Sequence, residues 1–303
     1  MDGIDQVIIE LRPGSQLALT LILLFMMLGV ALGLKPEHFA FIRRSPGKIV
    51  VGATTQMLGL PLLTLAFLYV WHLPASVALG MIIVACCPGG NSSNVMTKIA
   101  GGNAAYSVSL TAVSSVLAPF YTPAAILFWA GLYPPAGGLI DSIEVNAADF
   151  FIRTSLILLL PLVTGMLVAQ YFPVLAERWS TRLTRVSLIL LFVLIFAGIM
   201  GNWRWIMLFG ALTLPLVAAH NSLSFLLGWL VGRKLIKESA SQRALTFEVG
   251  IQNSGLGLVI LLSQFDGLGG AALIISTWGI WHFVGGFSAI GLYRRVDRKA
   301  APV

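Results

Sequence analysis

Charged residues are scarce in this chain of 303 amino acids: they make up 10 % of it, whereas soluble domains usually carry about 25 %. So few charges leave too little polar surface to keep a long chain in water. The mean hydropathy is +0.90. Apolar runs of roughly 18 residues or more recur, each long enough to cross a bilayer core of about 30 Å. Composition therefore predicts an all-α protein that crosses a membrane several times.

Cysteine is almost absent as well. Cys86 and Cys87 are the only two, and they are adjacent within an apolar stretch, so they form neither a disulfide framework nor a metal site. We interpret them as small packing residues. The sequence also lacks a nucleophile–base set, a GxSxG motif and any metal-binding motif. An enzyme is therefore disfavoured, and we expect the protein not to be one.

The apolar segments predict nine transmembrane helices joined by short connections, with no stretch long enough for a soluble domain. Their expected ranges are 17–34, 48–71, 75–98, 104–132, 149–173, 186–203, 206–232, 244–263 and 270–293. The whole chain, residues 1–303, is expected to form one membrane domain. It divides into two unequal repeats, 17–132 (which lacks its first helix) and 149–293.

The basic residues indicate the orientation of these helices. With the N-terminus outside, only Arg12, Arg153 and Arg204 of the 19 Lys and Arg residues lie on the outer side. Arg178, Arg182 and Arg185, for example, fall in the inner connection between the fifth and sixth helices. The net charge of +7 is thus explained without a nucleic-acid partner. We expect the C-terminus to lie in the cytoplasm and the protein to occupy the plasma (inner) membrane.

Two of the expected helices contain residues that break helices. The third includes Pro88, Gly89 and Gly90: proline removes a backbone donor, and paired glycines destabilise a helix further. In the eighth, glycines flank the polar run at residues 252–254. Non-helical backbone at membrane depth is tolerated only when it is buried in protein or lines a cavity. Because the breaks are five helices apart, the broken helices run in opposite directions, which is typical of inverted-repeat transporters.

Glu248 lies inside the eighth apolar segment, and the few Lys and Arg residues within the apolar segments lie near segment ends, so none is placed at membrane depth to neutralise it. A lone acid at membrane depth is costly unless it is paired, protonated or bound to a cation. The residues that follow it carry amide and hydroxyl oxygens, which are hard ligands suited to sodium. Two alternatives stay open: an acid that carries the coupling proton, and a protonated acid that bonds backbone.

Polar residues in two other segments bear on this choice. Ser107 and Thr111 are four residues apart and share one helix face. Taken alone, such residues more often bond helix backbone or join neighbouring helices. Considered beside Ser93 and Glu248, they are better interpreted as oxygen ligands of a cation. Gln56 is a further amide in an apolar run, and an interhelical hydrogen bond explains it equally well.

Residues 86–97 (CCPGGNSSNVMT) and 248–256 (EVGIQNSGL) together resemble the bile acid:sodium symporter family. Residues 33–36 (GLKP) and the pair His220-Asn221 are also similar to that family. The resemblance extends from about residue 20 to residue 290. It implies a panel domain and a core domain, and the core carries two broken helices that cross.

The resemblance also implies where ions and substrate bind. One sodium ion is expected at Ser93, Asn94, Ser107, Thr111 and Glu248, and a second at Gln56, Gln252 and Glu248 with the backbone carbonyls of Val249 and Ile251. The substrate cavity is expected to involve Asn91, Ser92, Asn253 and Ser254. The two sodium ions are co-substrates, and no cofactor or obligatory protein partner is expected.

The implied function is sodium-coupled import of an organic anion, a bile acid or similar carboxylate, by alternating access. The alternative is a carrier of pantoate or another small carboxylate, coupled to sodium or to protons. A passive channel and an exporter are further alternatives.

Overall fold

The structure is a computed structural model that describes residues 3–6, 15–34, 36–143, 146–201, 203–265 and 268–300; Arg12 and Lys35 lie outside these ranges. Helices account for nearly all of this part of the chain. They are η1 (Ile4–Gln6), α1 (Ser15–Leu32), α2 (Pro36–Arg44), α3 (Pro46–Thr54), the π-helix η2 (Thr55–Gly59), α4 (Leu60–Trp71), α5 (Ala75–Cys86), α6 (Asn91–Ile99), α7 (Ala104–Gly131), α8 (Pro134–Ser142), α9 (Ala147–Tyr171), α10 (Pro173–Gly201), α11 (Trp203–Leu235), α12 (Ser239–Gly250), α13 (Ser254–Gln264) and α14 (Gly269–Ala300).

Within the described ranges, five helical stretches are long and apolar enough to cross a membrane: Pro46–Trp71, Ala104–Gly131, Ala147–Tyr171, Phe209–Leu235 and Gly269–Arg298. Thr20–Leu32, Ala75–Cys86 and Ser254–Gln264 are shorter apolar helices. The predicted class, an all-α protein with several membrane-spanning helices, is confirmed. The expected count of nine stays a prediction.

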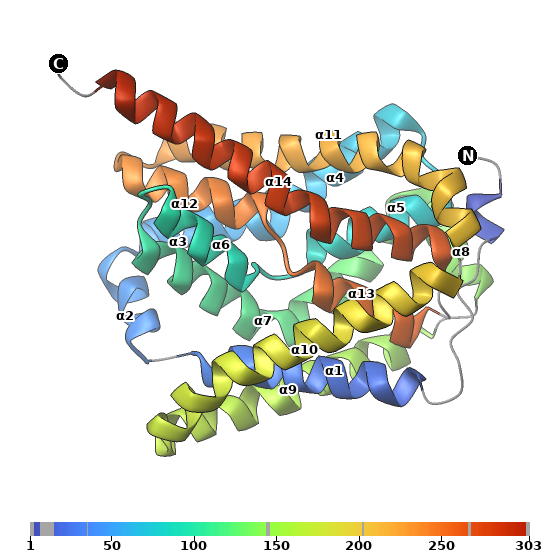
Figure 1. The fold of residues 1–303 in the computed structure, drawn as a ribbon, viewed down its shortest axis with the longest axis horizontal. Helices are drawn as coiled ribbons and strands as arrows, with labels where there is room; N and C mark the ends of the chain where they lie inside the picture. The colour runs from blue at the N-terminus through green and yellow to red at the C-terminus, as the bar shows by residue number, and fades with distance from the viewer. Residues whose placement is uncertain are drawn as a thin grey trace.

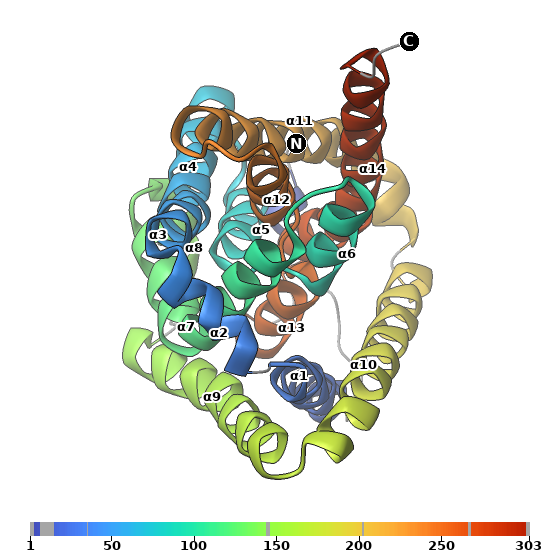
Figure 2. The same ribbon diagram turned by 90° about the vertical axis from the view of Figure 1, so that its left-hand side faces the viewer.

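The helices form two groups, seen from one end of the molecule in Figure 2. We call the group of α1, α9 and α10, which pack on one another, the panel. The larger group, which we call the core, contains α4 to α7 and α11 to α14, with the broken pairs α5–α6 and α12–α13 at its centre. Contacts of α1 with α13 and of α9 with α7 join the two groups. This arrangement places the broken helices against the panel.

Several basic connections meet at one end of the molecule, opposite the end that holds η1 (Figure 1). The Lys48 ammonium donates to Glu238 (2.5 Å), and it holds the pKa of that carboxyl below its ordinary value. Arg243 of α12 donates both to Asp297 of α14 (2.8 and 2.5 Å) and to the Ala100 carbonyl (2.8 Å). These contacts join the expected inner connections to one another. They therefore hold together the ends of the core helices next to the two broken pairs.

The expected loop at residues 174–185 is wrong, because α10 begins at Pro173. Proline suits the first position of a helix, and the following Leu, Ala, Glu and Arg residues are strong helix formers. The helix therefore extends beyond the apolar run, whose limit at residue 186 does not mark the start of the helix. Arg185 is therefore a helix residue in the panel and not a loop residue.

Candidate functional site

Both predicted breaks are present: Pro88 and Gly90 lie between α5 and α6, and residues 251–253 lie between α12 and α13. The two non-helical segments pair with each other in a short antiparallel bridge. The N–H of Asn253 donates to the Pro88 carbonyl (2.9 Å), and the N–H of Gly90 donates to the Ile251 carbonyl (3.5 Å). Each break thereby satisfies backbone groups of the other, as buried backbone requires.

Gly89 occupies the tightest point of this crossing. A Cβ atom added there would lie 2.8 Å from Glu248 Oε2 and 3.1 Å from Gln56 Nε2. The Gly89 N–H donates to Ser114 Oγ (3.3 Å). The glycine therefore does more than interrupt a helix, because its missing side chain lets the carboxylate and the amide reach the backbone.

Glu248 is completely buried, with none of its surface exposed. Its carboxylate accepts hydrogen bonds from Ser93 Oγ, from Ser107 Oγ (2.6 Å) and from Thr111 Oγ1 (2.9 Å). Among the described residues, no Lys, Arg or His side chain bonds to it. The acid is thus surrounded by neutral hydroxyl groups from two helices, α6 and α7.

The three hydroxyl groups of this cluster have more hydrogen-bond acceptors around them than protons to donate. Ser93 Oγ also faces the Gly90 carbonyl (2.7 Å), while Ser107 Oγ and Thr111 Oγ1 also face Asn94 Oδ1 (2.8 and 3.3 Å). Because each hydroxyl has one proton, it donates to only one of its two neighbours. Oxygen lone pairs therefore face one another around a carboxylate, an arrangement that a small cation stabilises. The five residues predicted for the first sodium ion fit such an ion.

A second cluster lies on the other side of the Glu248 backbone. Gln56 projects from η2, and its Nε2 donates to the Glu248 carbonyl (3.1 Å) and to Gln252 Oε1 (3.2 Å). The Nε2 of Gln252 donates to the carbonyls of Glu248 and Val249 (both 3.0 Å). Within the described part of the chain, Gln56 Oε1 is buried without a hydrogen-bond partner. An ion at these carbonyls requires both amides to turn so that their oxygens face it. The Ile251 carbonyl, expected as a further ligand, accepts from the Gly90 N–H (3.5 Å), which leaves its second lone pair for an ion.

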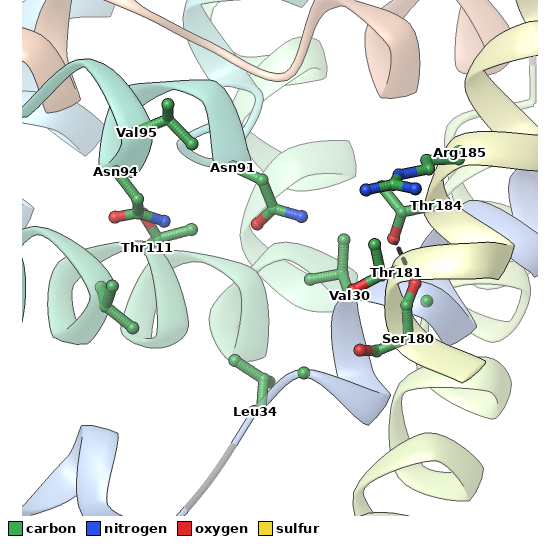
Figure 3. A pocket seen from close by; sticks show the side chains of 13 residues that line it. Val30, Leu34, Asn91, Asn94, Val95, Thr111, Ser180, Thr181, Thr184 and Arg185 are labelled. Carbon is green, nitrogen blue, oxygen red and sulfur yellow. Dashed lines mark hydrogen bonds between the residues drawn. The ribbon is translucent and has the colours of Figure 1, made fainter. Parts of the chain in front are cut away.

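A cavity of about 340 Å³ lies between the panel and the core, next to the Glu248 cluster (Figure 3). Its lining comes from four helices and the residues after one of them: Gly29 and Val30 of α1 with the following Gly33 and Leu34, Asn91, Asn94 and Val95 of α6, Val108 and Thr111 of α7, and Ser180, Thr181, Thr184 and Arg185 of α10. Asn94 and Thr111 belong to both the cavity wall and the Glu248 cluster. A molecule in the cavity therefore touches residues that also hold the acid.

Residues 20–208 of the chain match the sodium bile acid symporter family. The chain belongs to that family. It is 33 % identical over 285 residues to the sodium-dependent transporter YocS of Bacillus subtilis, an alignment that covers 93 % of this chain and 85 % of that protein. It is 34 % identical over 243 residues to a probable chloroplast sodium/metabolite cotransporter of Oryza sativa subsp. japonica, covering 80 % of this chain and 55 % of that protein. The human P3 protein is 27 % identical over 224 residues, covering 73 % and 45 %.

Membership of the sodium bile acid symporter family establishes a membrane transporter, not an enzyme, and a sodium-dependent one in general terms. It does not select among substrates, because the relatives' names range from sodium-dependent transporter to sodium/metabolite cotransporter.

The four residues expected to contact the substrate differ in their surroundings, and one of them borders the cavity. Asn91 lines the cavity and is exposed, and Ser92 beside it is half-buried. The Asn253 side chain caps α13 by accepting from the Leu256 N–H (3.1 Å). Ser254 is buried and packs against Gly279 of α14. Asn91 is the one of the four that borders the described cavity, and the substrate roles of the others stay predictions.

Two polar residues of the crossing were not predicted from the sequence. Thr97 Oγ1, which is fully buried, lies 3.3 Å from Ser107 Oγ. Ser114 Oγ accepts from Gly89 and donates to the Thr111 carbonyl (3.1 Å). Their spacing could have identified them, since Thr97 follows Ser93 by one helical turn and Ser114 follows Ser107 by two.

His220 and Asn221, the pair of α11 that resembles the family, lie next to the crossing of the two broken helices. Asn221 Nδ2 donates to the Gly250 carbonyl at the end of α12 (2.8 Å). His220 Nδ1 accepts from Trp278 Nε1 (3.1 Å), so its Nε2 carries the proton that points to Thr64 Oγ1 (2.9 Å). Both ring nitrogens are satisfied and the side chain is fully buried, so this histidine packs within the core.

Proposed function

We propose that this transporter is a symporter that imports an organic anion with sodium by alternating access. The observation that carries the proposal is the buried Glu248 carboxylate, which has no basic partner among the described residues. Three hydroxyl groups surround it, and these groups have more hydrogen-bond acceptors around them than protons to donate. A buried charge is costly unless an opposite charge accompanies it. Sodium supplies that charge and accepts hard oxygen ligands, and the sodium dependence named for the relatives supports this choice.

Two sodium ions are assigned as co-substrates. The first binds between the Glu248 carboxylate, Asn94 and the hydroxyls of Ser93, Ser107 and Thr111. The second binds at the Glu248 and Val249 carbonyls, joined by Ile251, when the amides of Gln56 and Gln252 turn their oxygens inward. Both ions hold the crossing segments together, so their binding stabilises the shape of the cavity wall.

Coupling between sodium and substrate follows from the shared residues. Asn94 and Thr111 contact the first ion on one side and the cavity on the other. An ion that fixes these side chains lowers the entropy cost of binding an anion there, and the anion must raise sodium affinity by the same factor. The amino-terminal end of α6, which starts at Asn91, adds a partial positive charge toward the anion.

The proposed orientation places the N-terminus outside and the C-terminus in the cytoplasm, within the plasma (inner) membrane. α1 then runs inward, and its last residues, with Gly33 and Leu34, line the cavity. The cavity therefore belongs to a form of the carrier that faces the cytoplasm. Rocking of the panel against the core is the step that exposes the same site to the outside.

The proposal is tested by uptake of radiolabelled pantoate and taurocholate into proteoliposomes with an inward sodium gradient or with potassium in its place. Accumulation above equilibrium in sodium alone supports symport, and the better substrate identifies the class of anion. Equal uptake in both salts contradicts sodium coupling.

Proton coupling is the second candidate function, because a protonated Glu248 would also satisfy the hydroxyls around it. It predicts accumulation driven by an inward proton gradient in sodium-free buffer. Sodium symport predicts none under that condition.

Ser107→Ala is expected to raise the sodium concentration for half-maximal uptake about 10-fold, because one ligand worth roughly 1–1.5 kcal/mol is lost. The matched control is Ser155→Ala, which removes a buried hydroxyl of α9 that bonds to none of the described residues. Sodium titration of uptake checks both variants. A common shift in the two, or no shift in Ser107→Ala, argues against Ser107 as a ligand.

A further inference from the structure

Arg185 carries the only charge among the thirteen described residues that line the cavity. It lies in the panel helix α10, and Figure 3 shows its guanidinium extending into the space toward Asn91 of the core. It makes no hydrogen bond and no ion pair with any described residue. A cation with five free donors thus faces the core across a cavity that otherwise contains amides, hydroxyls and apolar groups.

The neighbouring arginines of α10 differ in this respect. Arg182 packs over the Trp179 ring, 5.7 Å from its centroid, and neither it nor Arg178 lines the cavity. Those two residues need no explanation beyond the excess of basic residues expected on the inner side. Arg185 is the residue of this helix whose charge is turned toward the core.

The lining indicates the chemistry of the ligand. A guanidinium binds a carboxylate through two parallel hydrogen bonds, and this geometry favours a planar anion. Asn91 and Thr181 provide donors and acceptors for hydroxyl or carbonyl groups elsewhere on the ligand. The volume of about 340 Å³ lies near the lower end of the range of ligand sites, roughly 300–1,000 Å³, which suits a small molecule better than a steroid.

We infer that Arg185 binds the carboxylate of a small organic acid in the cavity between panel and core, and so acts as a specificity-determining residue contributed by the panel. The inference rests on the proposed function and deepens it. The bound anion lies between two positive charges, the guanidinium on one side and the first sodium ion beyond Asn94 and Thr111 on the other. The panel thus recognises the substrate charge, while the core holds the coupling ions.

The test uses the full-length protein in nanodiscs of phosphatidylcholine, in sodium buffer, titrated with pantoate and with its neutral amide, pantoamide. Arg185→Gln is expected to weaken pantoate binding roughly 10-fold to 100-fold and pantoamide binding by less than about 3-fold. Arg185→Lys keeps the charge without the paired geometry and is expected to fall between wild type and Arg185→Gln. Arg182→Gln is the matched control on the same helix and should bind both ligands as wild type does.

Equal losses for pantoate and pantoamide, or unchanged pantoate binding in Arg185→Gln, overturn the assignment of Arg185. Failure of wild type to bind pantoate while it binds taurocholate overturns the small-acid class. Displacement of pantoate by nanodiscs that contain phosphatidylglycerol identifies a lipid headgroup site instead. Sodium binding measured without any anion distinguishes failure of the Arg185 assignment from failure of the proposed function. It should be unchanged in Arg185→Gln. Its absence from wild type contradicts the proposed function.

Discussion

Glu248→Gln is expected to abolish sodium-stimulated uptake, with a loss of at least about 100-fold. Removing one partner of a buried ion pair costs roughly 3–5 kcal/mol, and each 1.4 kcal/mol is a factor of ten. Glutamine keeps the size of the side chain but removes its charge, so the hydroxyls of Ser93, Ser107 and Thr111 keep an oxygen acceptor. The protein should therefore remain folded. Uptake against sodium concentration, with thermal unfolding on the same preparation, measures both effects.

The matched control for this variant is Asp149→Asn, which neutralises an exposed acid that pairs with Arg153 at 2.8 Å. Exposed pairs contribute little, about 0–1 kcal/mol, so sodium-stimulated uptake should persist. Undiminished sodium stimulation in Glu248→Gln, at normal protein levels, would rule out Glu248 as the coupling residue.

Gly89→Ala is the second change expected to have a large effect. The added methyl group would lie 2.8 Å from Glu248 Oε2 and 3.1 Å from Gln56 Nε2, so it intrudes on both ion clusters at once. Overpacking of this kind costs about 1–3 kcal/mol, and here the atoms that must move are the ligands. We expect loss of uptake together with weaker binding of both sodium ions, measured by uptake and by sodium titration of the purified protein.

Gly90→Ala is the control at the adjacent position. The nearest atoms to its added methyl group, Gln252 O and Ser92 Oγ, lie 3.4 Å away, which is ordinary contact. Neither glycine has positive φ, so backbone strain does not separate the two variants. Indistinguishable activity of Gly89→Ala and Gly90→Ala would show that close approach at Gly89 is not required.

The central features of the site could be predicted from the sequence because polar and helix-breaking residues stand out in an apolar chain. Pro88 and the glycines that follow it predict a break in the helix. An acid such as Glu248 is costly at membrane depth, so its presence there indicates a functional site. The periodicity of Ser107 and Thr111 places their side chains on one face, and the structure brings that face to Glu248. Local pattern was sufficient for these residues, since each signal lies within one or two turns.

Other features depend on contacts between distant segments, which local pattern does not encode. The pairing of Pro88 with Asn253 sets the register of the crossing, yet these residues are far apart in the chain. The π-helix at Thr55–Gly59, which carries Gln56, has no distinct sequence pattern, although such distortions are frequent at functional sites. The direction of Arg185 was missed because its segment was assigned to a loop.

The most direct test of sodium binding at the crossing is the number of radioactive sodium ions bound per molecule of purified protein at saturation. Two ions are predicted for wild type. One is predicted for Gln56→Leu, which loses an amide of the second cluster, and one for Glu248→Gln, which loses the carboxylate of the first cluster but keeps the backbone carbonyl of the second. Wild-type stoichiometry in Glu248→Gln, or no saturable sodium binding by wild type, would contradict the assignment of sodium to this site.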